Sequence, residues 1–240
     1  MKIIGKNAVN ELIKTDKTVD KILVQNGMRD GESQAIIKGA KNRGYKVQFA
    51  EKAVLDKECP NGRHQGFIAF TSDFIYTEFE DLLNSVKDKD DAFVVVADGI
   101  EDPHNLGSII RVLECAGADG LVIGKHRSAQ VTDLVMRISE GSANHLPVSR
   151  VVNLNTAIDK FKEVGLWAYA LELGGENIYK SNLKGKLLLV IGGEDTGVNR
   201  LTKEKCDGII TIPMRGKVNS LNASVALGVG VFEAMRQRNN

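Results

Sequence analysis

Short apolar runs alternate with helically spaced apolar residues along the first third of the chain. The elements that this pattern predicts there are helices near 7–14 and 32–42 and strands at 21–24, 45–49 and 66–70. We therefore expect a small α/β domain over residues 1–72. The charge-rich segment 73–91 ends in five consecutive charged residues, which predicts a linker with room for a short strand or helix.

From residue 92 onward the apolar runs become cleaner and are separated by helical patterns. The predicted strands are 92–97, 120–124, 145–151, 166–171, 186–192 and 208–213. Continuous apolar runs of this length are typical of strands that are buried on both faces of a parallel sheet. The fold class predicted for residues 92–240 is therefore an α/β domain built on a parallel sheet.

Composition narrows the class of protein further. The chain is 42% hydrophobic and 26% charged, as expected for a folded globular protein. It lacks both a signal-peptide pattern and an apolar stretch of about 18 residues, so we expect a cytoplasmic protein without a membrane span. Three scattered cysteines and four histidines without ligand spacing predict no metal site.

Charge is distributed unevenly although the formal net charge is only +1. Residues 1–70 hold 13 basic and 8 acidic side chains, whereas the remainder holds 19 basic and 23 acidic ones. A basic domain offers contacts to phosphate groups, so the first third is the part in which RNA binding is expected.

Ligands of open α/β sheets collect beyond the carboxyl ends of the strands, so loops that follow strands are candidate sites. The first such loop, residues 98–117, leads into a helix with an apolar stripe. Arg111 lies off that stripe and can face a ligand. Asn105 is expected to cap this helix, and Gly107 permits close backbone approach.

The second loop follows the strand at 186–192 and runs through Gly192, Glu194 and Gly197. It lacks the glycine spacing of a dinucleotide-binding fingerprint and the lysine of a P-loop, which argues against a nicotinamide dehydrogenase. A tight turn explains its glycines, but it explains less well a carboxylate at the very end of a buried strand.

The third loop precedes a helix expected from residue 221 to about 234. This helix is apolar almost all round, which predicts burial on most sides. Ser220 and Asn222 lie at its N-terminus, where backbone N–H groups are free to bind a ligand; Ser220 can instead serve only as a helix cap.

Together, the three loops resemble the three sequence motifs of the SpoU (TrmH-like) branch of the SPOUT RNA 2′-O-ribose methyltransferases. Further family-like segments are Gly5–Val9 and His64–Gly66, which resemble the small RNA-binding domain of the RlmB-like enzymes that modify a guanosine of 23S rRNA. The residues that match the motifs are Asn105, Gly107 and Arg111, then Gly192, Glu194 and Gly197, then Ile212–Met214, Gly216 and Ser220–Ser224.

The resemblance implies a C-terminal domain knotted as a trefoil, a homodimer with a shared active site, and S-adenosylmethionine as cofactor. It implies 23S rRNA or its precursor as substrate. Cofactor-binding positions would be Gly192, Ile212 and Leu221. The reacting centre would be lined by Asn105, Arg111, Glu194, Ser220 and Asn222.

Arg111 is the family's candidate for removing the proton of the ribose hydroxyl, but a guanidinium is normally only a hydrogen-bond donor. We therefore expect it to bind phosphate and stabilise the developing alkoxide. Arg63 and His64, next to a Gly-rich turn, are candidates for contact with RNA. The alternatives are a tRNA 2′-O-methyltransferase of the same branch and a non-catalytic RNA-binding or ribosome-assembly protein on the same fold.

Overall fold

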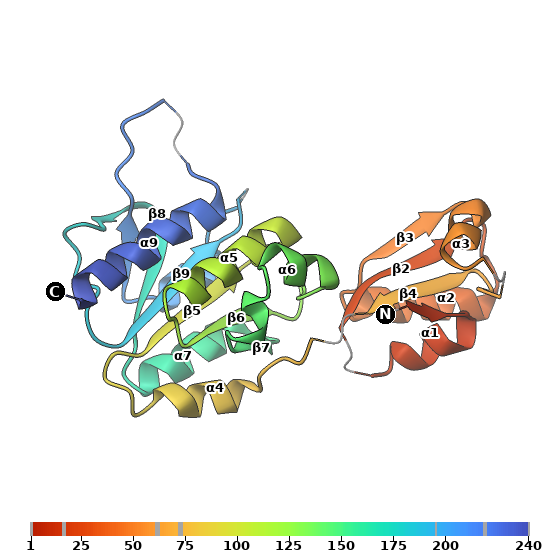
Figure 1. The fold of residues 1–240 in the computed structure, drawn as a ribbon, viewed down its shortest axis with the longest axis horizontal. Coiled ribbons are helices and arrows are strands. Elements are labelled where there is room, and N and C mark those ends of the chain that lie inside the picture. The colour runs from red at the N-terminus through yellow and green to blue at the C-terminus, as the bar shows by residue number, and fades with distance from the viewer. Residues whose placement is uncertain are drawn as a thin grey trace. The chain divides into compact units, whose positions relative to one another are not determined.

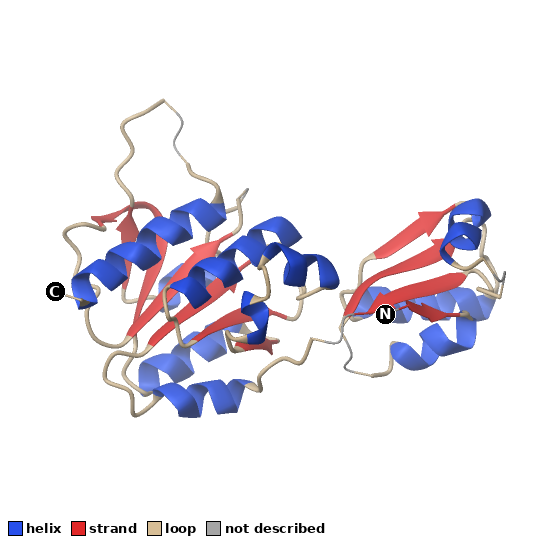
Figure 2. Ribbon diagram, viewed as in Figure 1, coloured by secondary structure: helices blue, strands red, loops and turns tan. Residues whose placement is uncertain are grey.

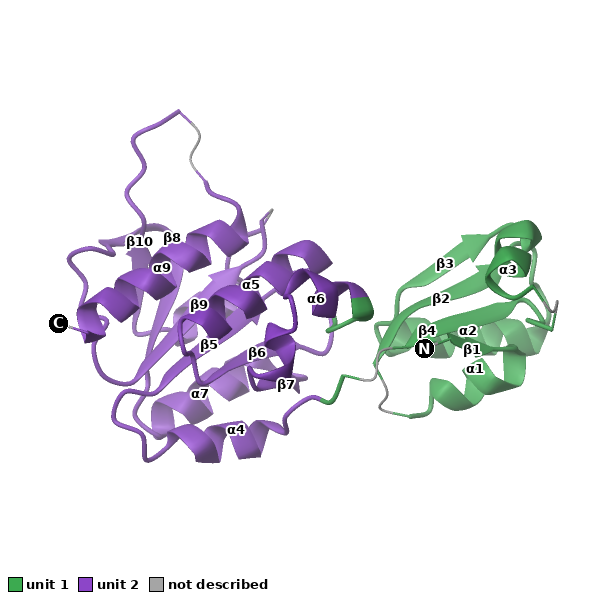
Figure 3. Cartoon of the chain, in the orientation of Figure 1, with its two compact units in different colours: residues 1–75, 130–133 green, residues 76–129, 134–240 purple. Residues whose placement is uncertain are grey.

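The computed structural model describes residues 2–15, 18–60, 63–71, 74–194, 196–217 and 220–239. The chain divides into two compact units (Figure 3). Unit 1 comprises residues 1–75 and 130–133, and unit 2 comprises residues 76–129 and 134–240. The predicted boundary between residues 72 and 73 lies outside the described residues.

Unit 1 is built on a mixed sheet, whose described strands follow the order β1-β4-β2-β3 (Figure 1). Strand β4 is antiparallel to both β1 and β2, and β2 is parallel to β3. Helices α1 and α2 pack on one face of this sheet, and α3 packs on the other. The elements are β1 (Lys2–Ile4), α1 (Lys6–Leu12), β2 (Val19–Gln25), α2 (Gly31–Asn42), β3 (Val47–Ala50), α3 (Lys52–Glu58) and β4 (Phe67–Thr71).

The described part of unit 2 contains a six-stranded sheet in the order β10-β8-β9-β5-β6-β7, and all of its strand pairs are parallel. This confirms the predicted parallel α/β architecture. The strands are β5 (Phe93–Asp98), β6 (Gly120–Gly124), β7 (Val148–Val151), β8 (Trp167–Asn177), β9 (Leu187–Gly192) and β10 (Gly208–Thr211). The helices after β4 are α4 (Phe79–Val86), α5 (Pro103–Cys115), α6 (Asp133–Ile138), the 3₁₀ turn η1 (Ser142–Asn144), α7 (Leu154–Glu163), α8 (Arg200–Lys205) and α9 (Ala223–Arg238).

Helices cover both faces of this sheet (Figure 2). Helices α4 and α7 lie on one face, where Leu82, Val86 and Phe161 join the apolar side chains of the strands in one core. Helices α5 and α9 pack together on the other face. Part of the segment that we predicted as a linker is therefore a packed helix of unit 2, because the apolar side of α4 is buried in this core.

Helix α9 is less buried than its composition predicts. Val225 and Phe232 are 52% and 50% exposed, although Leu227, Val231 and Ala234 are buried. The helix thus has one apolar side in the core and another that faces solvent in the single chain.

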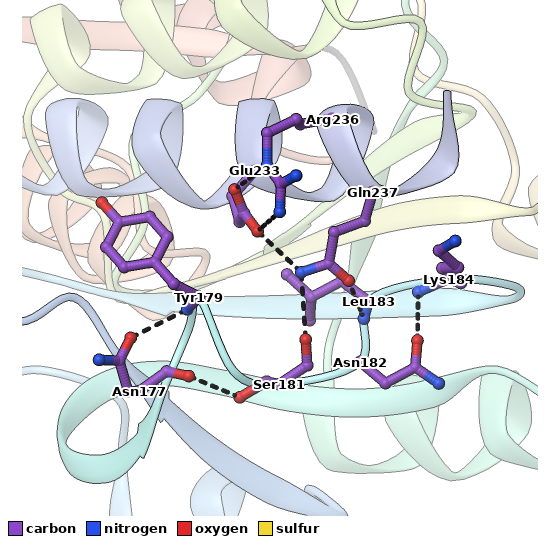
Figure 4. A network of polar contacts seen from close by, with 9 residues as sticks. All are labelled: Asn177, Tyr179, Ser181, Asn182, Leu183, Lys184, Glu233, Arg236 and Gln237. Carbon is purple, nitrogen blue, oxygen red and sulfur yellow. Dashed lines mark hydrogen bonds and ion pairs between the residues drawn. The ribbon is translucent and has the colours of Figure 1, made fainter. Parts of the chain in front are cut away.

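A polar network fixes the C-terminal part of α9 to the segment between β8 and β9 (Figure 4). Gln237 accepts a hydrogen bond from the backbone of Leu183 at 2.9 Å and donates one to the carbonyl of Ser181 at 3.1 Å. Glu233, which is 7% exposed, accepts hydrogen bonds from Arg236 and Gln237. These contacts hold the helix whose N-terminus enters the candidate site.

Candidate functional site

Three loops that are far apart in the sequence meet at the side chain of Asn222. Its Nδ2 donates a hydrogen bond to Oδ1 of Asn105, at 2.9 Å, and another to Oε1 of Glu194. Its Oδ1 caps α9 by accepting from the backbone of Ser224, at 3.0 Å, and of Val225, at 3.3 Å. One amide group therefore joins the start of α5, the loop after β9 and the start of α9.

Asn105 does not cap α5 as we expected. The cap is Asp102, whose carboxylate accepts from the backbone of His104 at 3.1 Å, and Pro103 occupies the first turn. An Asp-Pro pair is a strong helix start, because the acid satisfies a free N–H and the proline has none to satisfy. This earlier start places Asn105 inside the first turns of α5, where it is only 6% exposed and reaches Asn222.

The loop after β9 is folded so closely on itself that its glycines cannot be replaced without movement. A Cβ atom on Gly192 would lie 2.0 Å from the carbonyl carbon of Gly197. Gly197 also has a φ of +63°, a conformation that L-residues seldom adopt. Asp98 holds this loop by accepting hydrogen bonds from the backbone of Gly193, at 3.0 Å, and of Asn199, at 2.9 Å.

Glu172 on β8 is a site residue that the sequence analysis missed. Its carboxylate accepts a hydrogen bond from the backbone of Val198 at 2.9 Å and lies against Gly197. The available signal was a carboxylate directly after the apolar run of the predicted strand 166–171, but it lies outside the three family motifs.

A cavity of about 320 Å³ opens beside these loops. Such a volume falls in the range of small-molecule sites, about 300–1,000 Å³. The lining includes the three predicted cofactor-binding residues, Gly192, Ile212 and Leu221, together with Glu194 and Ser220. Further lining residues are Leu171, Glu172, Leu173, Ile191, Gly193, Thr196, Gly197, Lys203, Met214, Ala223 and Ala226.

A second cavity, of about 270 Å³, lies next to the first and shares Gly193, Glu194 and Thr196 with it. Asn105 lines this second cavity. The carboxylate of Glu194 thus lies where the two cavities adjoin, beside the amide groups of Asn105 and Asn222.

Arg111 is not among the residues that line either cavity within the described part of the chain. Its side chain is 51% exposed and pairs with Glu140 through an Nη1–Oε1 distance of 2.9 Å. Gly107 explains how this pair forms, because a Cβ there would lie 2.6 Å from the side chain of Ile138. The close approach predicted at Gly107 is therefore an approach of the α6 segment, which carries Glu140 toward Arg111.

His64 is a structural residue and not the predicted RNA contact. It is 3% exposed, its Nε2 lies 3.0 Å from Oδ1 of Asp56, and its Nδ1 accepts from the backbone of Gly66 at 3.0 Å. Both ring nitrogens are therefore engaged inside unit 1. Arg63 is exposed, and its contact with RNA stays a prediction.

No helix of the described residues combines the length and apolarity that a bilayer crossing requires. No group of three or more His, Cys, Asp or Glu side chains among them is arranged to hold a metal ion.

The chain is an α/β protein in which the start of α5, the loop after β9 and the start of α9 meet beside two cavities at the carboxyl edge of a parallel sheet. Residues 92–232 match the family model of the SpoU rRNA methylases, and residues 2–77 match that of an RNA 2′-O ribose methyltransferase substrate-binding domain. The chain therefore belongs to the SpoU rRNA methylase family.

Known proteins of similar length resemble the chain in sequence, in fold or in both. YacO of Bacillus subtilis, named for the TrmH family of tRNA/rRNA methyltransferases, is 40% identical over 99% of this chain and 96% of its own length. A Staphylococcus haemolyticus protein named for the same family is 42% identical over 98% of this chain and 95% of its own. The SpoU methyltransferase AviRb of Streptomyces viridochromogenes, solved with AdoMet, superposes with a TM-score of 0.62 at 22% identity, covering 99% and 90% of the two chains.

Proposed function

We propose that this RNA methyltransferase transfers the methyl group of S-adenosylmethionine to the 2′-hydroxyl of a guanosine in 23S rRNA or its precursor. The observation that carries the proposal is the bonding of Asn222 to both Asn105 and Glu194. It brings all three family motifs together beside a cavity of suitable size. Unit 1, which matches the substrate-binding model, would supply affinity for the RNA.

The first cavity suits S-adenosylmethionine in both shape and chemistry. Gly192 leaves no room for a side chain, so backbone groups form this wall, while Ile212 and Leu221 supply apolar surface. The carboxylates of Glu172 and Glu194 suit the positive charge of the cofactor. When bound, the cofactor supplies an electrophilic methyl carbon, and the protein supplies orientation and charge.

The residues around Asn222 would position the ribose hydroxyl and accept its proton. An in-line displacement requires the 2′-oxygen to lie opposite the leaving sulfur, so the acceptor must be held firmly. Asn105 and Asn222 would fix that position, and Glu194 and Ser220 would pass the proton toward solvent.

Arg111 would act on the phosphate and on the developing alkoxide, as a charged donor. In the single chain it pairs with Glu140 and does not line either cavity within the described residues. We propose that it serves the site of a second copy of the chain, in a homodimer that uses the exposed apolar side of α9. Val225 and Phe232, each about half exposed, support this assignment.

The proposal also includes a trefoil knot that forms where α9 and the loop after β10 pass beside the loop after β9. Two observations support it. Asn222 contacts Glu194, and β10 pairs with β8, although β9 precedes β10 in the sequence. A limited thermolysin digest of native protein should leave this region uncut.

Incubation with labelled S-adenosylmethionine and unmodified 23S rRNA or tRNA tests the substrate class. We expect 2′-O-methylguanosine in the rRNA digest and none in the tRNA digest. Methylation of tRNA alone would favour a tRNA enzyme of the same branch. The family name of YacO includes both tRNA and rRNA as substrates. Cofactor binding without transfer to either RNA would contradict the proposed reaction.

A further inference from the structure

A cluster of lysines around one aromatic ring lies on the α3 side of the unit 1 sheet. Phe70 on β4 is the direct cross-strand neighbour of Lys2 on β1 and of Lys21 on β2. The Nζ atoms of these lysines lie 5.6 Å and 4.8 Å from the centre of the ring. Three adjacent strands therefore present a cation, an aromatic ring and a second cation in one row, which we call the Lys-Phe-Lys row.

The ring of Phe70 is held in place from beneath. It is half-buried and packs against an apolar cluster formed by Leu23, Leu55, Cys59 and Ile68. This cluster lies between the sheet and α3. A fixed, partly exposed ring on a sheet is the kind of surface on which nucleic-acid bases stack.

The charges around the row are not balanced. Lys2 pairs with Glu58, the Nζ–Oε2 distance being 2.6 Å. Neither Lys21 nor Lys57 forms an ion pair with any residue that the structure describes. Lys2 and, less strongly, Lys21 and Lys57 nevertheless hold the pKa of Glu58 below its ordinary value, so all three ammonium groups lie near this one carboxylate. The surface therefore keeps an excess of positive charge.

We propose that the Lys-Phe-Lys row is the surface by which unit 1 binds single-stranded segments of the substrate RNA. A base stacks on Phe70, and the flexible lysines turn from the ring to the flanking phosphates. The inference rests on the proposed function, because it takes RNA as the substrate, but it assigns a surface that no motif of the sequence indicated. The row takes the place of His64 as a candidate for contact with RNA, because the buried ring of His64 cannot reach a ligand.

Fluorescence anisotropy of a labelled mixed-sequence 12-nucleotide RNA, titrated with the full-length protein at several KCl concentrations, tests the surface. In the double variant Lys2→Gln with Lys21→Gln, the salt slope should fall by about 1.4, because each single-strand phosphate contact contributes about 0.7. Affinity at 0.1 M salt should weaken at least about tenfold. The variant Phe70→Leu should lose about tenfold in affinity without a change of slope, because it loses stacking and no charge.

The matched control removes two positive charges from elsewhere in unit 1. Lys14, which follows α1, and Lys38 in α2 are exposed and lie outside the row. The double variant Lys14→Gln with Lys38→Gln should keep both the affinity and the slope of the wild type. An equal loss in this control would contradict a specific surface and leave only a general effect of charge.

S-adenosylmethionine binding and methyl transfer by the wild-type protein, measured in parallel, separate this inference from the proposed function. If the wild type methylates RNA but the Lys2 and Lys21 variant keeps its affinity and slope, the surface is wrong and the function stands. If the wild type transfers no methyl group but the variant loses slope, the function is wrong and the surface stands. The lysine variants decide the matter even where Phe70→Leu lowers stability.

Discussion

The side chain of Asn222 serves two purposes through two different atoms, and a substitution can separate them. Its Oδ1 caps α9, whereas its Nδ2 joins Asn105 and Glu194. Aspartate is as good a helix cap as asparagine but has no donor. In Asn222→Asp the cap is kept, but the new carboxylate oxygen faces the carboxylate of Glu194, so we expect the free energy of unfolding to fall by about 1–3 kcal/mol. Methyl transfer to RNA should fall about 10²- to 10³-fold, as for other lost positioning donors.

The control for this prediction is Asn222→Ala, which removes the cap as well. It should lose the same activity, and loss of the cap should lower the free energy of unfolding by about 1 kcal/mol, without the contact between two carboxylates, as measured by urea unfolding. Wild-type turnover in Asn222→Asp would show that the donor is not needed and would contradict the assigned role.

Arg111 forms an exposed ion pair. Substitution of this residue should therefore change the stability of the protein little and its methyl-transfer activity strongly. Its partner Glu140 is 66% exposed, and such surface pairs contribute about 0–1 kcal/mol. In Arg111→Ala we expect an almost unchanged thermal midpoint and a loss of methyl transfer of at least about 10²-fold. The variant Glu140→Gln should unfold like wild type and keep substantial transfer. An active Arg111→Ala enzyme would be incompatible with its assigned role.

For single residues, the sequence predicted which side chains come together but did not always predict their roles. Asn105, Glu194 and Asn222 were named from their motifs, and the structure joins them. The capping role given to Asn105 was wrong, because Asp102 starts the helix three residues earlier. The burial of His64 depends on its contact with Asp56, which no local pattern indicates.

The glycines of the loop after β9 show how an element forms the wall of a cavity. In Gly192→Ala the new methyl group would lie 2.0 Å from the backbone of Gly197, so the loop has to move. We expect a loss of about 1–3 kcal/mol of stability, as for overpacked sites, and a weaker affinity for S-adenosylmethionine measured by calorimetry. As a control, Gly31→Ala places its methyl group in open space and should change neither.

The contribution of Glu233 in α9 to the free energy of unfolding should depend on pH. Hydrogen bonding to Arg236 lowers the pKa of this carboxyl from 4.5 to about 2. A lowered pKa in the folded state means that the carboxylate stabilises the fold above about pH 4.5, and that this contribution is lost as the pH falls toward 2. Urea unfolding should therefore separate wild type from Glu233→Gln clearly at pH 7 and much less at pH 3. An equal separation at both values would contradict the role of this charge.

Elements within the parallel sheet were the most predictable part of the fold. The range of β6 was predicted in full, and β9 begins one residue after the predicted start, since uninterrupted apolar runs mark strands buried on both faces. Strand β8 extends well beyond its apolar run because it pairs with β10 through a register shift between Ile209 and Ile210. Pairing of this kind depends on a partner distant in sequence, so local patterns miss it.

For the whole molecule, the exposed apolar side of α9 predicts an association of two chains. Val225→Asp combined with Phe232→Asp should produce a monomer in analytical ultracentrifugation, and the proposed service of Arg111 to the site of a second copy predicts that transfer is then lost. The matched control is Val152→Asp, at a residue that is 73% exposed on unit 2 and outside α9, which should leave the assembly unchanged. A double variant that still forms dimers would place the interface elsewhere.

The arrangement of the whole chain was the least accessible from local pattern. Apolar spacing predicts strands, but the order β10-β8-β9-β5-β6-β7 depends on which strands, distant in the sequence, pair with each other. The parallel sheet and the two-part organisation followed from pattern and composition. The convergence of the three loops was expected from their places after strands and from the resemblance to a family, whereas nothing in their spacing fixes their distance in space.

The most direct test of the account is to map 2′-O-methyl groups at single-nucleotide resolution in unmodified 23S rRNA after reaction with labelled S-adenosylmethionine. The wild-type protein and Asn222→Asp would be compared at equal occupancy of the cofactor. We predict one methylated guanosine with the wild type and its loss in the variant. Methylation at many positions, at a nucleotide other than guanosine, or equally in both proteins would contradict the central claim.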